Sequence, residues 1–290
     1  MTGMKDKRIA VYTGLLLCLF LCPLPSVAGN VQAVVSVPPL AWLIDEIGGD
    51  TVDVEILVPE GHVPESSQPA PRSMVRLRTA QIIILVGHPS FTFETRFVKP
   101  QLSGEQVSAS INLYELAVSA YSPAEINAVD PHLWTSPHTI RAAIRRVAEQ
   151  LSRLDPRYAG VYAERADRLS GRVDALADRF QAMADQRPSK QFVVYHPAWG
   201  SLARDFGLQQ LAIEHEGKSP GPARLARLLD DIAKMENSVI ITSPGHAQRD
   251  AAVIARQHNV RIEVVDPLMR DWLGMMQHIM TVLADRESNG

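Results

Sequence analysis

The hydrophobic positions of this chain alternate between short β-branched runs and longer amphipathic stretches. Residues 32–37 form a β-branched run, residues 38–47 have helical spacing that ends at Gly48-Gly49, and residues 52–58 alternate again. A loop rich in proline and a stretch with helix signals follow, and residues 81–86 then predict another apolar strand. Strands that alternate with helices are typical of a parallel sheet in an α/β protein.

The middle of the chain predicts one long helix. Asp155 is a suitable helix cap, Pro156 suits the first turn, and apolar residues between positions 158 and 183 recur at steps of three or four, or at a pair of such steps. A helix of about 30 residues is about 45 Å long, and this one would end before Pro188. It could cross a two-lobed molecule as a stiff backbone, or it could pack on the surface of one lobe.

The alternation of strands and helices resumes after residue 188. The pattern predicts strands at residues 192–195, 238–242 and 260–265, and helices at residues 224–236, 248–258 and 272–284. The second half of the chain is therefore also expected to be α/β.

The N-terminus has the features of a secretory signal peptide. A basic start at residues 5–8 precedes the apolar residues 9–22, and Ser26-Val27-Ala28 supplies the small residues of a cleavage site. We expect cleavage after Ala28, which makes residues 1–28 the signal peptide. Both cysteines of the chain lie in that segment, so a metal site in the mature protein would have only His, Asp and Glu ligands.

The rest of the chain is long enough for two lobes of about 100 to 150 residues each. We expect an N-terminal α/β lobe over residues 29–140, a linking region with the long helix over residues 141–187, and a C-terminal α/β lobe over residues 188–290. The formal net charge of −3 gives no reason to expect a nucleic acid as a partner.

Three motifs far apart in the sequence place a side chain that can bind metal beside a proline. They are Asp130-Pro131-His132, His196-Pro197 and Asp266-Pro267. His196 and Asp266 each come directly after a predicted strand, and loops at the carboxyl ends of parallel strands line one crevice. Two imidazoles and a carboxylate suit zinc or manganese, so these motifs predict a metal site.

The order and spacing of these motifs resemble a known family, the periplasmic metal-binding proteins of bacterial ABC importers for zinc and manganese. The resemblance covers nearly the whole mature chain and includes Ser36-Val37-Pro38-Pro39-Leu40, Asp130-Pro131-His132-Leu133-Trp134 and Val265-Asp266-Pro267-Leu268. It implies two parallel-sheet α/β lobes joined by one long rigid helix, with a metal site at their interface bound from four loops. It also implies a periplasmic monomer that delivers metal to a membrane permease.

Carried over by position, the resemblance makes His132, His196 and Asp266 metal ligands. This chain departs from the family in the first ligand loop, where Glu65 stands at the position usually held by a histidine. We expect Glu65 to supply the remaining ligand, with His62 of the same loop as the alternative and a water molecule as a third arrangement.

The ligand set bears on the identity of the metal. Two imidazoles with two carboxylates form a harder site than three imidazoles with one carboxylate, which favours manganese or ferrous iron. Zinc still binds such sites more tightly than manganese at equal availability. Zinc is therefore the expected ligand, and manganese or ferrous iron is the alternative.

Several other polar residues have both a functional and an ordinary structural interpretation. His88, His215 and His246 are candidates for the rim of the site, although a lone histidine is more often an ordinary surface residue. Glu214 and Glu216 could attract a cation electrostatically, but the interpretation as a solvated charged loop is preferred. Asp130 either orients an imidazole or is a turn residue.

An enzymatic function is not expected. The sequence has no His-Glu-x-x-His motif, no nucleophile elbow and no phosphate-binding loop. A zinc hydrolase that uses Glu65 as a general base is the weaker alternative, because it needs an open coordination position beside that base.

Overall fold

The computed structural model describes residues 29–64, 67–102, 109–119, 129–214, 239–244 and 260–284, together with residues 221, 228, 232, 252, 255 and 256. Over these residues the strands form two four-stranded parallel sheets, in the orders β2-β1-β3-β4 and β6-β5-β7-β8. The strands of the first sheet are β1 (Val31–Val35), β2 (Val52–Ile56), β3 (Ile82–Leu85) and β4 (Ala109–Asn112). Those of the second are β5 (Gln191–Val194), β6 (Gln209–Ala212), β7 (Val239–Thr242) and β8 (Arg261–Val264).

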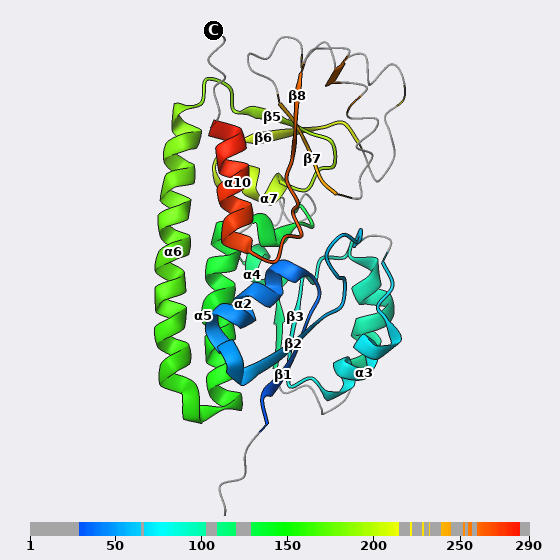
Figure 1. Ribbon diagram of the computed structural model, residues 1–290, viewed down its shortest axis with the longest axis vertical. Coiled ribbons are helices and arrows are strands. Elements are labelled where there is room, and N and C mark those ends of the chain that lie inside the picture. The colour runs from blue at the N-terminus through cyan, green and yellow to red at the C-terminus, as the bar shows by residue number, and fades with distance from the viewer. Residues whose placement is uncertain are drawn as a thin grey trace, which may run out of the picture. The chain divides into compact units, whose positions relative to one another are not determined.

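Helices connect the strands of each sheet and join the two sheets (Figure 1). The described α-helices are α2 (Pro38–Gly48), α3 (Pro71–Thr79), α4 (Leu113–Val118), α5 (Pro137–Leu154), α6 (Ala159–Gln186), α7 (Gly200–Asp205) and α10 (Trp272–Ala284). A π-helical turn spans Glu94–Val98, and 3-10 turns span Gly49–Thr51, Lys99–Gln101, Leu133–Thr135 and Pro156–Tyr158.

The long helix predicted from the sequence is confirmed as α6, preceded by a 3-10 turn. The Asp155 carboxylate accepts a hydrogen bond from the Arg157 backbone N–H at 3.3 Å, as expected of a capping residue. The helix α6 packs on α5 and on α2 of the first sheet, and also on α10, which follows the second sheet (Figure 1). The alternative of a surface helix on one lobe is therefore wrong.

Other elements differ from the sequence-based expectation. The helix α5 and the strands β4 and β6 were not predicted. The helices predicted at residues 224–236 and 248–258 fall mostly outside the described residues. The lobe boundaries at residues 140 and 187 stay a prediction.

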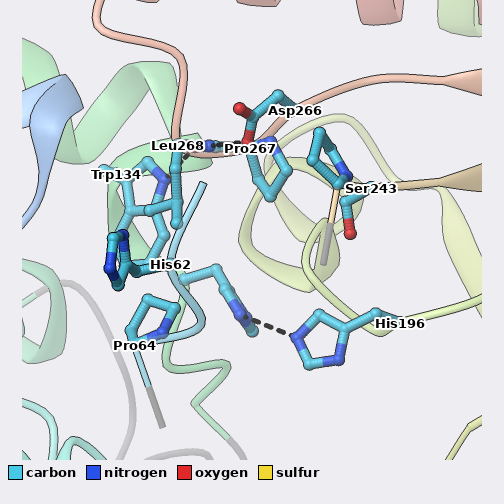
Figure 2. Close-up of a pocket in the computed structure, with 10 residues that line it drawn as sticks. His62, Pro64, Trp134, His196, Ser243, Asp266, Pro267 and Leu268 are labelled. Carbon is cyan, nitrogen blue, oxygen red and sulfur yellow. Dashed lines mark hydrogen bonds between the residues drawn. The ribbon is translucent and has the colours of Figure 1, made fainter. Parts of the chain in front are cut away.

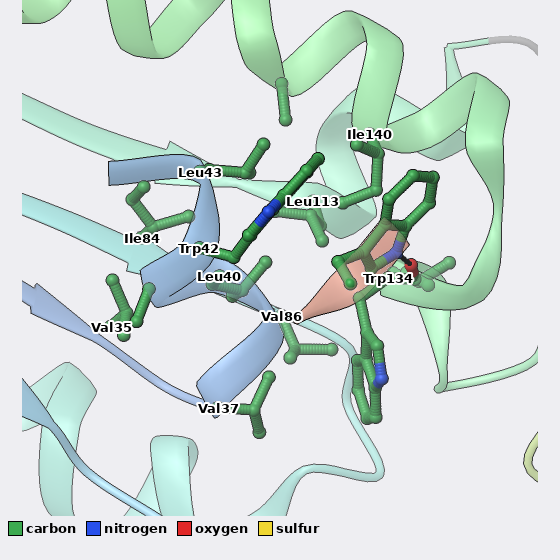
Figure 3. Packing of buried hydrophobic residues seen from close by; sticks show 14 of the residues in the cluster. Val35, Val37, Leu40, Trp42, Leu43, Ile84, Val86, Leu113, Trp134 and Ile140 are labelled. Atoms are coloured by element: carbon green, nitrogen blue, oxygen red, sulfur yellow. Dashed lines mark hydrogen bonds between the residues drawn. The ribbon is translucent and has the colours of Figure 1, made fainter. Parts of the chain in front are cut away.

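The core beneath the first sheet is apolar and extends to α5. Val35 of β1, Ile84 of β3 and Leu43 of α2 are fully buried. Figure 3 shows them in one apolar cluster with Trp42 and Ile140. When helices cover both faces of a parallel sheet, its strands have nearly continuous apolar sequences. The strand β3 has the sequence Ile-Ile-Ile-Leu. The sequence of the strand thus explains why this sheet lies inside the molecule.

The central strand β5 of the second sheet packs apolar side chains on both faces of the sheet. In β5, Phe192 and Val194 belong to the main core, whereas Val193 and the following Tyr195 belong to a separate cluster with Ile240. Successive side chains of a strand point to opposite faces, so this division follows from the period of the strand.

A small polar network ties the start of α5 to the end of α7. Ser136 accepts a hydrogen bond from the Thr139 backbone N–H at 3.0 Å and donates to the Asp205 carboxylate at 2.6 Å. His138 Nδ1 lies 3.2 Å from the same carboxylate. The hydrogen bond to Asp205 raises the pKa of His138 above its ordinary value, although burial acts in the opposite direction.

This network predicts a pH-dependent contribution to stability. A histidine with a raised pKa in the folded state stabilises fully below its unfolded pKa of about 6.5, and the contribution is lost as pH rises through the folded pKa. The side chain of His138 is 67% exposed, so solvent screening limits the effect to a few tenths of a kcal/mol. We expect His138→Gln to reduce the free energy of unfolding at about pH 5.5 more than at about pH 8.5. Urea denaturation of both proteins at the two pH values measures this, and an equal loss at both would contradict it.

Candidate metal centre

Two histidines from separate loops meet at the centre of the candidate site. His132 lies just before the 3-10 turn Leu133–Thr135, and His196 lies two residues after β5. Their Nε2 atoms are 3.3 Å apart, as the dashed line beside His196 in Figure 2 marks. The two rings are nearly perpendicular, with an interplanar angle of 84°. The structure thus brings together two of the residues that the sequence motifs singled out.

The other nitrogen of each imidazole faces a carboxylate. Asp130 Oδ1 lies 3.1 Å from His132 Nδ1 and also accepts the His132 backbone N–H at 2.8 Å. Glu214 Oε1 lies 2.6 Å from His196 Nδ1. A carboxylate accepts from a protonated Nδ1 and leaves the lone pair on Nε2, which is the arrangement typical of metal-binding histidines. Of the two interpretations of Asp130, the structure supports the one in which it orients the imidazole.

Glu214 is a functional candidate whose role the sequence-based interpretation missed. Its exposed fraction is 6%, so the interpretation as part of a solvated charged loop is wrong. It follows the unpredicted strand β6, whose parallel pairing with β5 places the ends of the two strands together. The apolar residues around Leu211 are the sequence signal that could have predicted β6 and a residue at its carboxyl end.

Asp266 lies in the same pocket as the histidine pair. It follows β8 by two residues, and its Oδ1 accepts the Leu268 backbone N–H at 2.9 Å. Burial raises the pKa of Asp266, and the nearby charge of Glu60 adds a smaller contribution in the same direction. The pocket in Figure 2 is lined by His62, Pro64, His132, Trp134, His196, Ser243, Pro244, Asp266, Pro267 and Leu268.

The first ligand loop contributes His62 to this pocket. His62 is an exposed side chain whose Nδ1 lies 3.3 Å from the backbone carbonyl of Glu60. Glu65, the preferred candidate from the sequence, lies outside the described residues. In the described part of the chain, no group of three or more His, Cys, Asp or Glu side chains is close enough to hold a metal ion. His62 and Asp266 therefore line the pocket without joining the histidine pair.

Arg270 connects this first loop to the loop that carries Asp266. Its guanidinium forms a two-pronged contact with the Asp45 carboxylate of α2, with distances of 2.9 and 3.0 Å. Its backbone N–H donates to Glu60 Oε1 at 3.2 Å. Paired hydrogen bonds from a guanidinium fix geometry as well as attract, so Arg270 holds the two loops beside each other.

His88 lies near His132 of the pair. Its Nδ1 accepts the Ser90 backbone N–H at 3.1 Å, and its ring meets Tyr114 edge-on. Burial lowers the pKa of His88, whereas a hydrogen bond with the Val129 backbone raises it. It therefore contacts the loop that leads to His132. His215 and His246 lie outside the described residues.

Trp134 links the loop of His132 to the loop of Asp266. Its ring lies edge-on to His132, with centroids 5.3 Å apart, and its Nε1 donates to the Pro267 carbonyl at 2.7 Å. Trp272 Nε1 donates in turn to the Trp134 carbonyl at 2.7 Å. The two loops are thus held by hydrogen bonds between buried groups.

Comparison with known proteins places this geometry among metal carriers. The sequence model of ZnuA, the periplasmic component A of a zinc-uptake complex, matches residues 33–286. The chain is 28% identical over 267 residues to the high-affinity zinc uptake system protein ZnuA of Paracoccus denitrificans, covering 80% of this chain and 81% of that protein. It is 23% identical over 242 residues to ZnuA of Bacillus subtilis, covering 79% of this chain and 76% of that protein.

Solved structures agree with the sequence comparison. A crystal structure of ZnuA has a TM-score of 0.79 and 25% sequence identity, and it covers 89% of this chain and 100% of that chain. The periplasmic zinc-binding protein TroA of Treponema pallidum has a TM-score of 0.77 at 19% identity, covering 89% and 99% of the two chains. The second likeness shows the shared fold alone.

The hydrogen bond between Trp134 and Pro267 predicts a measurable loss of stability. Trp134→Phe removes the N–H donor and leaves the buried Pro267 carbonyl unpaired, which costs about 1–3 kcal/mol. Trp42→Phe is the matched control, because Trp42 is buried in the same core and no hydrogen bond to a described residue is seen for its indole. We expect Trp134→Phe to lower the free energy of unfolding in urea by more than the control does. Equal losses in the two variants would contradict this role of the indole N–H.

Proposed function

The chain belongs to the ZnuA family of periplasmic zinc-uptake components, and we propose that it captures a divalent transition metal and delivers it to an ABC permease. Members of this family work with such permeases and bind metal. Zinc is the proposed metal. The family consists of solute-binding proteins rather than enzymes, which supports a carrier over a hydrolase.

The distance between the two imidazoles is the observation that carries this proposal. Two nitrogens bound at about 2.0–2.1 Å to one tetrahedral zinc are about 3.3–3.4 Å apart. His132 Nε2 and His196 Nε2 are separated by 3.3 Å. When each Nδ1 donates its proton to the carboxylate that it faces, the Nε2 lone pair of each ring points toward the other ring. A proton on one Nε2 can join the two nitrogens as a hydrogen bond, and a metal ion bound by both nitrogens can take the place of that proton.

We propose that His132, His196 and Asp266 are three of the ligands and that the first loop supplies the fourth. The sequence favours Glu65 for that role, and the position of His62 in the pocket with the other three residues supports His62 as the alternative. Glu65 stays a prediction. The hydrogen bond from the Arg270 backbone N–H to the Glu60 carboxylate connects the first loop to the loop of Asp266. This contact supports a ligand from the first loop.

The choice between His62 and Glu65 also bears on the metal. Three imidazoles and one carboxylate form a softer site and favour zinc, whereas a second carboxylate shifts the preference toward manganese or ferrous iron. The presence of His62 in the pocket supports zinc, and manganese or ferrous iron remains the alternative that a Glu65 ligand would favour.

We further propose that the protein is exported, with cleavage after Ala28, and that it acts as a monomer in the periplasm. Its relatives include proteins named as periplasmic components and as lipoproteins. Residues 1–28 lie outside the described part of the chain. Within that described part, no helix combines the length and the apolar character needed to span a membrane.

The proposed histidine ligands are tested by metal binding. We expect His132→Ala and His196→Ala each to weaken zinc affinity at least about tenfold, equivalent to about 1.4 kcal/mol. His138→Ala is the control, because His138 lies on α5 and does not line the pocket. Competition titration of metal-free protein against a zinc chelator measures the affinities. Unchanged affinity in both ligand variants would remove this site.

The ligand from the first loop is tested by a pair of variants. If His62 coordinates, His62→Ala should weaken zinc binding at least about tenfold, and Glu65→Ala should leave it nearly unchanged. The same titration repeated with manganese reports whether the metal preference changes. The reverse pattern would restore Glu65 as the ligand and move the preferred metal toward manganese.

A further inference from the structure

We propose that Glu214 is a positioning residue that fixes the direction and tautomer of His196 for metal binding, an inference that rests on the proposed function. Glu214 lies behind the imidazole and does not line the pocket. It therefore acts through His196 rather than as a ligand.

The contact between the two side chains is short and enclosed. Glu214 Oε1 and His196 Nδ1 are 2.6 Å apart, and the side chains are 7% and 10% exposed. A hydrogen bond to an ionised acceptor is shorter and stronger than a neutral one. With Nδ1 held as the donor, the Nε2 of His196 is the nitrogen that faces His132.

The backbone of the second sheet places Glu214 beside His196. The parallel ladder between β5 and β6 continues past both strands, because the Ile213 N–H donates to the Val194 carbonyl at 2.9 Å and the Glu214 N–H donates to the Tyr195 carbonyl at 2.9 Å. The residue after Tyr195 is His196. These main-chain hydrogen bonds thus place Glu214 beside His196.

The first sheet contains the corresponding junction with apolar side chains at the two matching positions. Its strands have the matching order, and the Val58 N–H donates to the Ser36 carbonyl at 3.0 Å as the Glu214 N–H does to Tyr195. Val58 therefore corresponds to Glu214, and Val37 corresponds to His196. Both valines are fully buried. The fold forms this junction with two apolar residues, so the glutamate and histidine are not needed to build it.

The energetic balance also indicates function rather than stability. Removing a carboxylate from water is costly, and replacing a buried ionic pair with apolar residues is often neutral or stabilising. Groups that orient metal ligands typically contribute 10- to 100-fold to metal affinity. Asp130 holds His132 in a similar way but also accepts a backbone N–H of its own loop.

The experiment compares three variants in zinc affinity and thermal stability. Glu214→Val copies the junction of the first sheet, and we expect about a 10- to 100-fold loss of zinc affinity without a large fall in melting temperature. Glu214→Gln keeps an oxygen acceptor for Nδ1 and should retain more of the affinity. Glu263→Val is the control, because Glu263 pairs with Arg261 on β8 and does not line the pocket.

A readout that needs no metal accompanies the titration. Nitrogen NMR of labelled histidines in the metal-free protein should show His196 protonated at Nδ1 in the wild type and a loss of this preference in Glu214→Val. Unchanged zinc affinity and unchanged tautomer in Glu214→Val would overturn the positioning role. If the wild type binds no zinc, the proposed function fails, and the NMR result alone then decides whether Glu214 orients the ring.

Discussion

Hydrogen bonds from two buried indoles hold the loop of His132 beside the loop of Asp266. Trp272 Nε1 donates to the Trp134 carbonyl, and Trp134 Nε1 donates to the Pro267 carbonyl. Both tryptophan side chains are fully buried, so neither carbonyl could exchange its partner for water without opening the core. The tilted contact between the rings of Trp42 and Trp272, with centroids 5.2 Å apart, extends this packing to α2. The loops of His132 and Asp266 therefore share the rigidity of the core.

Polar groups can be buried at the candidate centre because nearly every one has a partner. His132 and His196 each use Nδ1 on a carboxylate and direct Nε2 at the other ring. The two parallel sheets have the same strand order, yet only the second carries an imidazole and a carboxylate at the junction where the first carries valines. The second sheet thus has side chains that can bind or orient a metal ligand at the two positions where the first sheet has apolar side chains. Arg270 also contacts Asp45 of α2 through its guanidinium and Glu60 of the first loop through its backbone N–H.

The sequence was informative wherever a pattern is local. The helix α6 was predicted from its cap and its apolar repeat, because the spacing of apolar residues in a helix can be recognised over a few turns. The motif around His132 was also readable, since Asp130 bonds a backbone N–H only two residues away. The short strand β6 and the helix α5 were missed. The strand β6 begins with Gln209 and Gln210, so its apolar signal begins only at Leu211. The apolar spacing of α5 from Ile140 to Leu151 could also have been recognised.

By itself the sequence determined the strand and helix alternation, the long helix and the motifs that contain His132, His196 and Asp266. Tertiary structure alone decided that Glu214 meets His196 from 18 residues away and that Trp134 reaches Pro267 across 133 residues. It also brought His62 into the pocket. Periodicity records which side of an element is buried, but it does not record which elements become neighbours. Strand order and loop packing set those contacts, and they depend on the whole chain at once.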